Sequence, residues 1–143
     1  ETCALHLNSL LDDNERIPVS LVVAQAIHES NWGKSRFARE GNNLYGIRTF
    51  DSSKDQLKPL DNPNVTWGLR IFETKCESVS YYMWLLNYSH HYSEFREERL
   101  MQYAEDLVNL DKLALTLAIY SEDVYYTQKI IRTLKKLESY DRD

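Results

Sequence analysis

Glu29 is the residue of this sequence best placed to act as a catalytic acid. It lies near the end of VSLVVAQAIHESNW (residues 19–32), which is apolar nearly all round and predicts a buried central helix. On that helix Val22 and Ala26 share a face with Glu29. Apolar neighbours exclude water from a carboxylate, disfavour its charged form and are expected to raise its pKa. A carboxylic acid that stays protonated near neutral pH can donate its proton to a glycosidic leaving oxygen.

A structural role for Glu29 stays open on residue types alone. A glutamate near the end of a helix can be solvated, or it can pair with a nearby cation, here Lys34 or Arg36. Gly33 is a stop signal just beyond the predicted helix. Ser30, next to the acid, is expected to bond the backbone.

The segment around Glu29 resembles the signature of glycoside hydrolase family 73, the endo-beta-N-acetylglucosaminidases of bacterial autolysins. The family pattern A-Q-A-x-x-E-S-x-W-G-x-S-x-x-A-x-x-x-N-N-L-F-G-I matches residues 24–47 without a gap, with Tyr45 in place of Phe. LRIFETKCESVSYY (residues 69–82) and YSEDVYYTQKI (residues 120–130) resemble two further family segments. SRFAREGNNLYG together with YSE is most similar to the Bax-like branch. Glu122 and Val124 depart from the family's Thr and Pro.

The resemblance implies an α+β, lysozyme-like fold, in which a predominantly helical lobe and a small β-hairpin lobe flank a substrate groove. It implies one glucosaminidase catalytic domain over residues 1–143, with the β lobe at about 44–73. Glu29 would be the general acid, and Tyr120 would orient substrate or water, unless it is a core tyrosine. The substrate-binding residues would be Trp32, Asn42, Asn43, Tyr45 and Tyr126. The Asn pair could instead be structural, holding the turn into the β lobe.

The second carboxylate of such a site is not fixed by any motif. The candidates in the hairpin are Asp51, Asp55, Asp61 and Glu73, of which Asp55 and Asp61 are preferred. If none serves, the substrate's own N-acetyl oxygen could assist attack at the anomeric carbon.

The resemblance predicts a peptidoglycan hydrolase that cuts the β-1,4 bond after N-acetylglucosamine, with no metal or organic cofactor. One alternative is a lytic transglycosylase or muramidase, which also relies on one glutamate. Another is a non-catalytic module that binds peptidoglycan on a hydrolase scaffold. The products distinguish these functions. Reducing-end N-acetylglucosamine indicates the glucosaminidase, anhydromuramic ends indicate the lytic transglycosylase, and binding without cleavage indicates the non-catalytic module.

Composition and charge exclude some classes of binding partner. The chain has 143 residues and a net charge of −5, with no basic block, which argues against nucleic acid. No apolar run reaches the length of a membrane span. The chain starts at Glu1 rather than Met, which indicates a processed or excised piece. The resemblance to cell-wall hydrolases predicts an exported protein in the periplasm or cell wall, and we expect a monomer. Cys3 and Cys76 are the only cysteines, and whether they pair is open.

The remaining pattern is mostly helical. LYGIRTF (residues 44–50) and TWGLRIFE (residues 66–73) predict a hairpin around a long, mobile polar loop. Thr74 and Glu77 form a capping box before the next helix. Asp111 is expected to cap the helix over residues 112–120, and Val124, Ile131 and Leu134 to face inward from the last helix.

Overall fold

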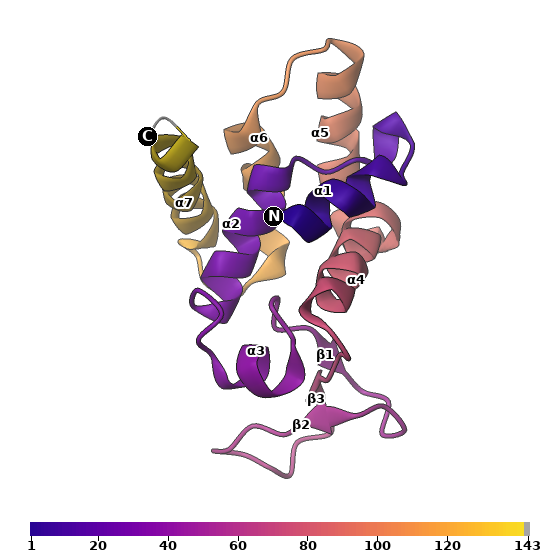
Figure 1. The fold of residues 1–143 in the computed structure, drawn as a ribbon, viewed down its shortest axis with the longest axis vertical. Coiled ribbons are helices and arrows are strands. Elements are labelled where there is room, and N and C mark those ends of the chain that lie inside the picture. The colour runs from indigo at the N-terminus through magenta and orange to yellow at the C-terminus, as the bar shows by residue number, and fades with distance from the viewer. Residues whose placement is uncertain (142–143) are drawn as a thin grey trace. The chain divides into compact units, whose positions relative to one another are not determined.

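Helices and one small antiparallel sheet build the chain in this computed structural model, which describes residues 1–141 (Figure 1). The α-helices are α1 (Thr2–Ser9), α2 (Val19–Ser30), α3 (Arg36–Gly41), α4 (Lys75–Tyr88), α5 (Ser93–Ala104), α6 (Leu110–Leu115) and α7 (Tyr126–Asp141). Short 3-10 helices are η1 (Asp13–Glu15), η2 (His90–Tyr92) and η3 (Ala118–Tyr120). The strands are β1 (Arg48–Thr49), β2 (Gln56–Leu57) and β3 (Gly68–Arg70). The chain forms two compact units, one of residues 26–82 and one of residues 1–25 with the chain from Met83 onward.

The sheet lies in the unit of residues 26–82. β3 is its central strand and pairs antiparallel with both β1 and β2, with Leu69 opposite Arg48 on one side and Leu57 on the other. The predicted hairpin between residues 44–50 and 66–73 is therefore confirmed as the β1–β3 pair. β2 is a correction, because residues 51–64 were predicted to be a loop throughout. A two-residue strand is too short to show the alternation that identifies strands in sequence.

The long loop after β2 is anchored at its base. The Lys58 ammonium donates hydrogen bonds to the carbonyl oxygens of Val65 (3.0 Å) and Trp67 (3.1 Å). Arg36 of α3 donates to the Lys58 carbonyl at 2.9 Å. The Arg48 guanidinium lies 4.0 Å from the centre of the Trp67 ring, which adds a cation–π contact. These contacts hold both sides of the loop to α3 and the sheet.

Two tyrosines centre the core of this unit. The rings of Tyr45 and Tyr82 are stacked, with centroids 4.0 Å apart and planes at 4°, and both side chains are buried. The start of α4 completes the core. Thr74 accepts a hydrogen bond from the Glu77 amide (3.1 Å), and Glu77 accepts one from the Glu73 amide (2.9 Å). The predicted capping box thus forms with its second bond shifted by one residue.

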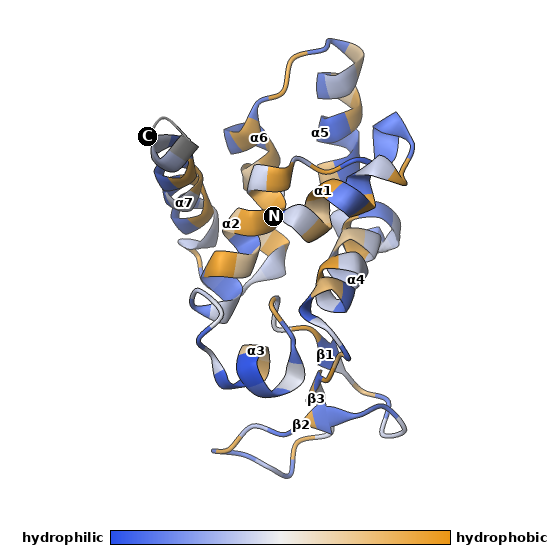
Figure 2. Ribbon diagram, viewed as in Figure 1, coloured by the Kyte–Doolittle hydropathy of each residue, from blue (hydrophilic) through white to orange (hydrophobic). Residues whose placement is uncertain are grey.

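In the other unit, α6 packs against α5 and α7. Asn109, not Asp111, caps α6: its side chain accepts from the Lys112 amide at 3.1 Å, and Asp111 lies in the first turn. Leu134 is buried as predicted, whereas Val124 is exposed because α7 begins only at Tyr126. Hydrophobic residues run along much of α2, which fits its prediction as a core helix (Figure 2).

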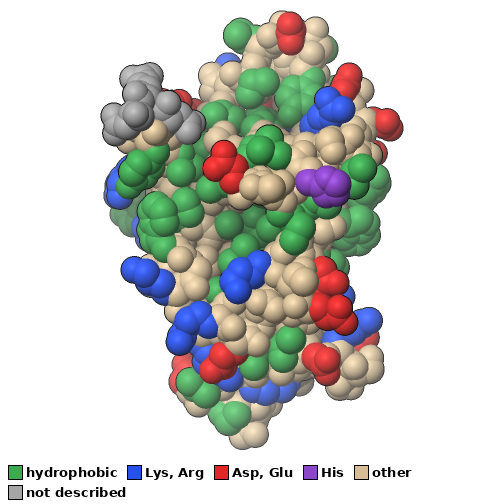
Figure 3. All heavy atoms as spheres, in the orientation of Figure 1, with side chains coloured by type: hydrophobic (Ala, Val, Ile, Leu, Met, Phe, Trp, Pro, Cys, Tyr) green, Lys and Arg blue, Asp and Glu red, His purple; other side chains and the backbone are tan. Residues whose placement is uncertain are grey.

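Three further features concern the cysteines, the lengths of the helices and the surface charge. Cys3 and Cys76 are both disulfide-bonded, and no cysteine is free in the described part of the chain. None of the helices within residues 1–141 is long and apolar enough to cross a membrane. On the face shown in Figure 3, acidic and basic side chains both appear around α3 and the strands. That face therefore has no single-sign surface of the kind that binds nucleic acid.

Candidate active site

Glu29 lies in the last turn of α2, and its carboxyl group faces the turn formed by residues 43–47. Its Oε2 atom is 3.7 Å from the position that a Cβ atom on Gly46 would occupy. Gly46 has a φ of +66°, a conformation that strains other residues, and its missing side chain leaves the backbone open beside the carboxyl group. The Glu29 side chain is partly buried. Arg36, one of the two cations considered as its partner, pairs with Glu40 instead, at 3.0 Å.

The helix that carries Glu29 ends in an unusual left-handed turn. Asn31, Trp32 and Gly33 have φ values of +51°, +58° and +76° in succession. Ser30 stabilises the turn, donating to the Ala26 carbonyl (2.6 Å) and accepting from the Gly33 amide (2.8 Å). Ser30 therefore bonds the backbone, as the sequence predicted.

Trp32 is presented to solvent by this turn. A positive φ is rare for a bulky residue and costs about 1–2 kcal/mol, and such strain gathers at functional sites. The Trp32 side chain is 54% exposed, three residues after Glu29 on the same unit. An exposed indole three residues along the chain from a carboxylic acid is a suitable surface for stacking on a sugar ring.

Asn42 ends α3 and ties it to the segment after β3. It adopts the left-handed conformation of a helix C-cap, with a φ of +53°. Its side-chain amide donates to the carbonyl oxygens of Phe72 (3.1 Å) and Glu73 (3.0 Å), and its oxygen accepts from Lys75 at 3.2 Å.

Asn43 clamps the turn that faces Glu29. Its amide donates to the carbonyl oxygens of Ile47 (2.9 Å) and Arg70 (3.0 Å). Its oxygen accepts from the amides of Tyr45 (3.3 Å) and Ile47 (3.1 Å). Both donors and both acceptor positions of the side chain are thus used by the backbone, and the residue is fully buried. These hydrogen bonds support the structural alternative for Asn42 and Asn43, in which the pair holds the turn into the β lobe.

Tyr45 also supports the turn from inside. Its ring is stacked on Tyr82, only 1% of the residue is exposed, and burial raises the pKa of its hydroxyl. Asn43 and Tyr45 were predicted to bind substrate. In this structure both side chains are buried and support the turn that faces Glu29.

Ser78 also supports the turn, a role that was not predicted from the sequence. Its buried hydroxyl accepts from the Leu44 amide at 3.3 Å and donates to the Lys75 carbonyl at 2.7 Å. It connects α4 to the 43–47 turn. Ser78 could have been recognised from the sequence, because it belongs to the Glu-Ser pair of the family segment over residues 69–82.

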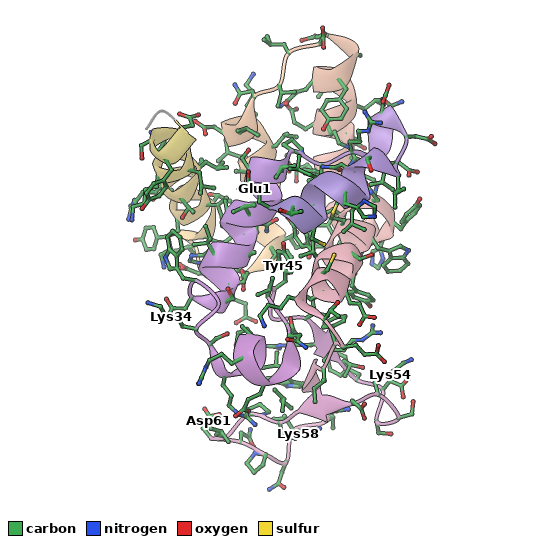
Figure 4. All side chains as sticks on the ribbon, viewed as in Figure 1. Glu1, Lys34, Tyr45, Lys54, Lys58 and Asp61 are labelled. Atoms are coloured by element: carbon green, nitrogen blue, oxygen red, sulfur yellow. The ribbon has the colours of Figure 1, made fainter. Side chains whose placement is uncertain are left out.

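The candidate second carboxylates lie on the surface of the β lobe. Asp61 is exposed at the tip of the loop after β2, at the opposite end of this unit from Tyr45 (Figure 4). Asp51 is held by Ser53, whose hydroxyl and amide hydrogen bonds lower the pKa of its carboxyl group. Asp55 and Glu73 are exposed. The structure therefore does not bring Asp61 to Glu29. No cluster of His, Cys, Asp or Glu within residues 1–141 could hold a metal ion.

Tyr120 and Tyr126 belong to the other unit, where they stack on each other. Their centroids are 6.0 Å apart with planes at 9°. Tyr126 is buried, and its hydroxyl accepts a hydrogen bond from Gln25 at 2.9 Å, whereas Tyr120 is partly buried. Asp123 shapes the loop between them by accepting from the Tyr125 amide and pairing with Lys129.

The two departures from the family pattern in this loop, Glu122 and Val124, are both exposed, so neither packs inside it.

Comparison with solved structures defines the class of fold. The C-terminally truncated glycoside hydrolase domain of Salmonella typhimurium FlgJ is similar, with a TM-score of 0.57 and 20% identity over 86% of this chain and 85% of that one. The predicted α+β, lysozyme-like fold is confirmed.

The chain belongs to the glucosaminidase family, whose model, described as mannosyl-glycoprotein endo-beta-N-acetylglucosaminidase, matches residues 9–139. The resemblance to glycoside hydrolase family 73 is thereby confirmed. Protein bax of Escherichia coli (strain K12) is 37% identical over 92 residues, 64% of this chain, which agrees with the Bax-like motifs. The chain spans about a third (32%) of the length of that relative.

Proposed function

We propose that this glucosaminidase-type glycoside hydrolase cuts the β-1,4 bond after N-acetylglucosamine in peptidoglycan. The observation that carries the proposal is the Glu29 carboxyl group facing the clamped turn at Gly46, inside the family motif. Glu29 would protonate the leaving oxygen, and residues 1–143 would act as one catalytic domain. Tyr120 would orient substrate or water. Asp55 remains the candidate second carboxylate, with the substrate's own N-acetyl oxygen as the alternative.

Product analysis tests this proposal. Purified peptidoglycan is incubated with the protein, and the released fragments are identified by mass spectrometry. Fragments with reducing-end N-acetylglucosamine are expected. Anhydromuramic or reducing muramic ends would instead identify a lytic transglycosylase or a muramidase.

Two further outcomes would also contradict the proposal. Binding to insoluble peptidoglycan with no fragment released would identify a non-catalytic module. Because the family description names mannosyl-glycoproteins, a glycoprotein with high-mannose glycans is tested in parallel. Release of glycans from that protein, with no fragments from peptidoglycan, would show that the substrate is a glycoprotein.

The proposed site of action is the periplasm or cell wall, with the protein as a monomer. Disulfide-bonded Cys3 and Cys76 support an oxidising compartment, since disulfides persist outside the cytosol.

Trp32 gives a prediction about affinity. In a Glu29→Gln background, Trp32→Ala is expected to weaken binding to insoluble peptidoglycan about fivefold to tenfold, because a stacking surface worth about 1 kcal/mol is lost. Trp32→Phe should retain most of the affinity. Sedimentation with peptidoglycan measures both. Phe50→Ala removes another exposed aromatic ring from the same unit (72% exposed) and is the control. Equal losses in Phe50→Ala and Trp32→Ala would contradict a specific role for Trp32.

A further inference from the structure

Arg70, the last residue of β3, holds its guanidinium group in a cradle of two aromatic rings. Its Cζ atom is 5.0 Å from the centre of the Phe72 ring and 4.7 Å from that of Tyr81. The ring centres are themselves 6.0 Å apart, with planes tilted by 53°. The guanidinium therefore lies within cation–π distance of both rings at once. Aromatic contacts of this kind fix the plane of an arginine and leave its N–H edge open.

This guanidinium lacks the acceptor that such a group normally has. Within residues 1–141, no carbonyl or carboxylate accepts a hydrogen bond from the Arg70 side chain, which is partly buried. By comparison, Arg36 donates to the Lys58 carbonyl and pairs with Glu40. Removing a cation from water is costly unless a partner replaces the water. A fixed, partly buried and unpaired guanidinium is therefore suited to bind an external acceptor.

Arg70 is attached to the turn that faces Glu29. Its amide donates to the Ile47 carbonyl at 2.9 Å, and its own carbonyl accepts from Asn43 at 3.0 Å. Ile47 follows Gly46, the residue beside the Glu29 carboxyl group. The backbone of Arg70 is therefore bonded directly to the turn that lies beside the Glu29 carboxyl group.

We propose that Arg70 binds a carboxylate on the stem peptides of peptidoglycan, so that the enzyme selects peptide-bearing strands over bare glycan. This inference rests on the proposed function. The planar guanidinium fork matches a carboxylate with two parallel hydrogen bonds, which are among the stronger hydrogen bonds in proteins. In intact peptidoglycan the lactyl carboxyl groups of the sugar strand are tied up in amide bonds to the stem peptides, so the strand itself is neutral and the free carboxylates lie on the peptides. Arg70 thus distinguishes the two forms by charge.

The experiment compares kcat/KM on three substrates. The first is peptide-bearing strands, the second is bare strands whose peptides have been removed by an amidase and whose freed lactyl carboxylates have been converted to carboxamides, and the third is peptide-bearing strands whose stem carboxylates have been converted to carboxamides. We expect the wild type to prefer the first over the second by roughly tenfold or more, the range for a charged hydrogen bond. The carboxamide strands should fall near the level of the bare strands. Arg70→Met, which keeps an unbranched side chain against both rings, should bring the preference close to one.

Arg39→Gln is the matched control, since it removes a positive charge from an exposed residue of the same unit, whose side chain donates to the Lys34 carbonyl. It should keep the wild-type preference. A wild-type preference near one, an unchanged preference in Arg70→Met, or carboxamide strands cut as well as the native ones would overturn the inference. If Arg70→Met does not fold, the wild-type comparison of native and carboxamide strands decides alone. Failure of the proposed function appears differently, as no reducing-end N-acetylglucosamine from any strand.

Discussion

Glu29→Gln is expected to lower kcat on peptidoglycan by about 10²–10⁴-fold, the usual contribution of a general acid. Glutamine has nearly the same shape as glutamic acid but carries no proton that it can transfer to a leaving oxygen. The side chain is only partly buried and ends beside Gly46, so the exchange introduces no clash. Release of soluble fragments and binding to insoluble peptidoglycan should be measured on the same preparation. Cleavage should be lost while binding is retained.

Glu40→Gln is the control for this prediction. Glu40 is exposed on α3 of the same unit and pairs with Arg36 at 3.0 Å. Surface pairs of this kind contribute at most about 1 kcal/mol, so the variant should keep nearly full activity. A Glu29→Gln protein that releases fragments at the wild-type rate would remove Glu29 from the mechanism. It would leave the family assignment intact, because that assignment depends on the whole match over residues 9–139.

The helix that carries Glu29 and the family of the chain could be predicted because both leave local traces in the sequence. An apolar stretch that ends in Glu29 predicts a buried helix, and α2 forms there. The gap-free motif over residues 24–47 indicated the family. β2 was missed because two residues carry no periodicity, and Val124 was misplaced because the helix pattern was extended too far upstream.

The roles of Asn43 and Tyr45 could not be separated from the motif in the same way. A family motif marks residues that a site needs, but it does not say whether they touch the ligand or the protein. Asn43 bonds Arg70, which is 27 positions further along the chain, and Tyr45 of the turn stacks on Tyr82 of α4. Such partners come together only after folding, so residue type and spacing cannot reveal them. The same holds for the aromatic cradle of Arg70.

Asn43→Asp should be the most destabilising single exchange in this site. The new carboxylate matches the amide in shape, but it cannot donate to the carbonyl oxygens of Ile47 and Arg70, and it faces both with a negative charge in a fully buried position. Loss of two buried hydrogen bonds, together with an unpaired buried charge, is expected to cost about 3–5 kcal/mol of the free energy of unfolding. Urea denaturation at neutral pH measures the change. Whole domains are stable by only about 5–15 kcal/mol, so the variant should unfold at a much lower urea concentration.

Asn64→Asp makes the same chemical change on an exposed loop residue of the same unit and should alter stability by no more than about 0.5 kcal/mol. A similar small change in Asn43→Asp would mean that the 43–47 turn does not depend on its central amide. Activity gives a second readout, because the same amide holds the turn in which Gly46 lies beside the Glu29 carboxyl group. Under conditions where Asn43→Asp is still folded, kcat should therefore fall together with stability. If stability falls while kcat stays at the wild-type value, the turn supports the fold without positioning the acid.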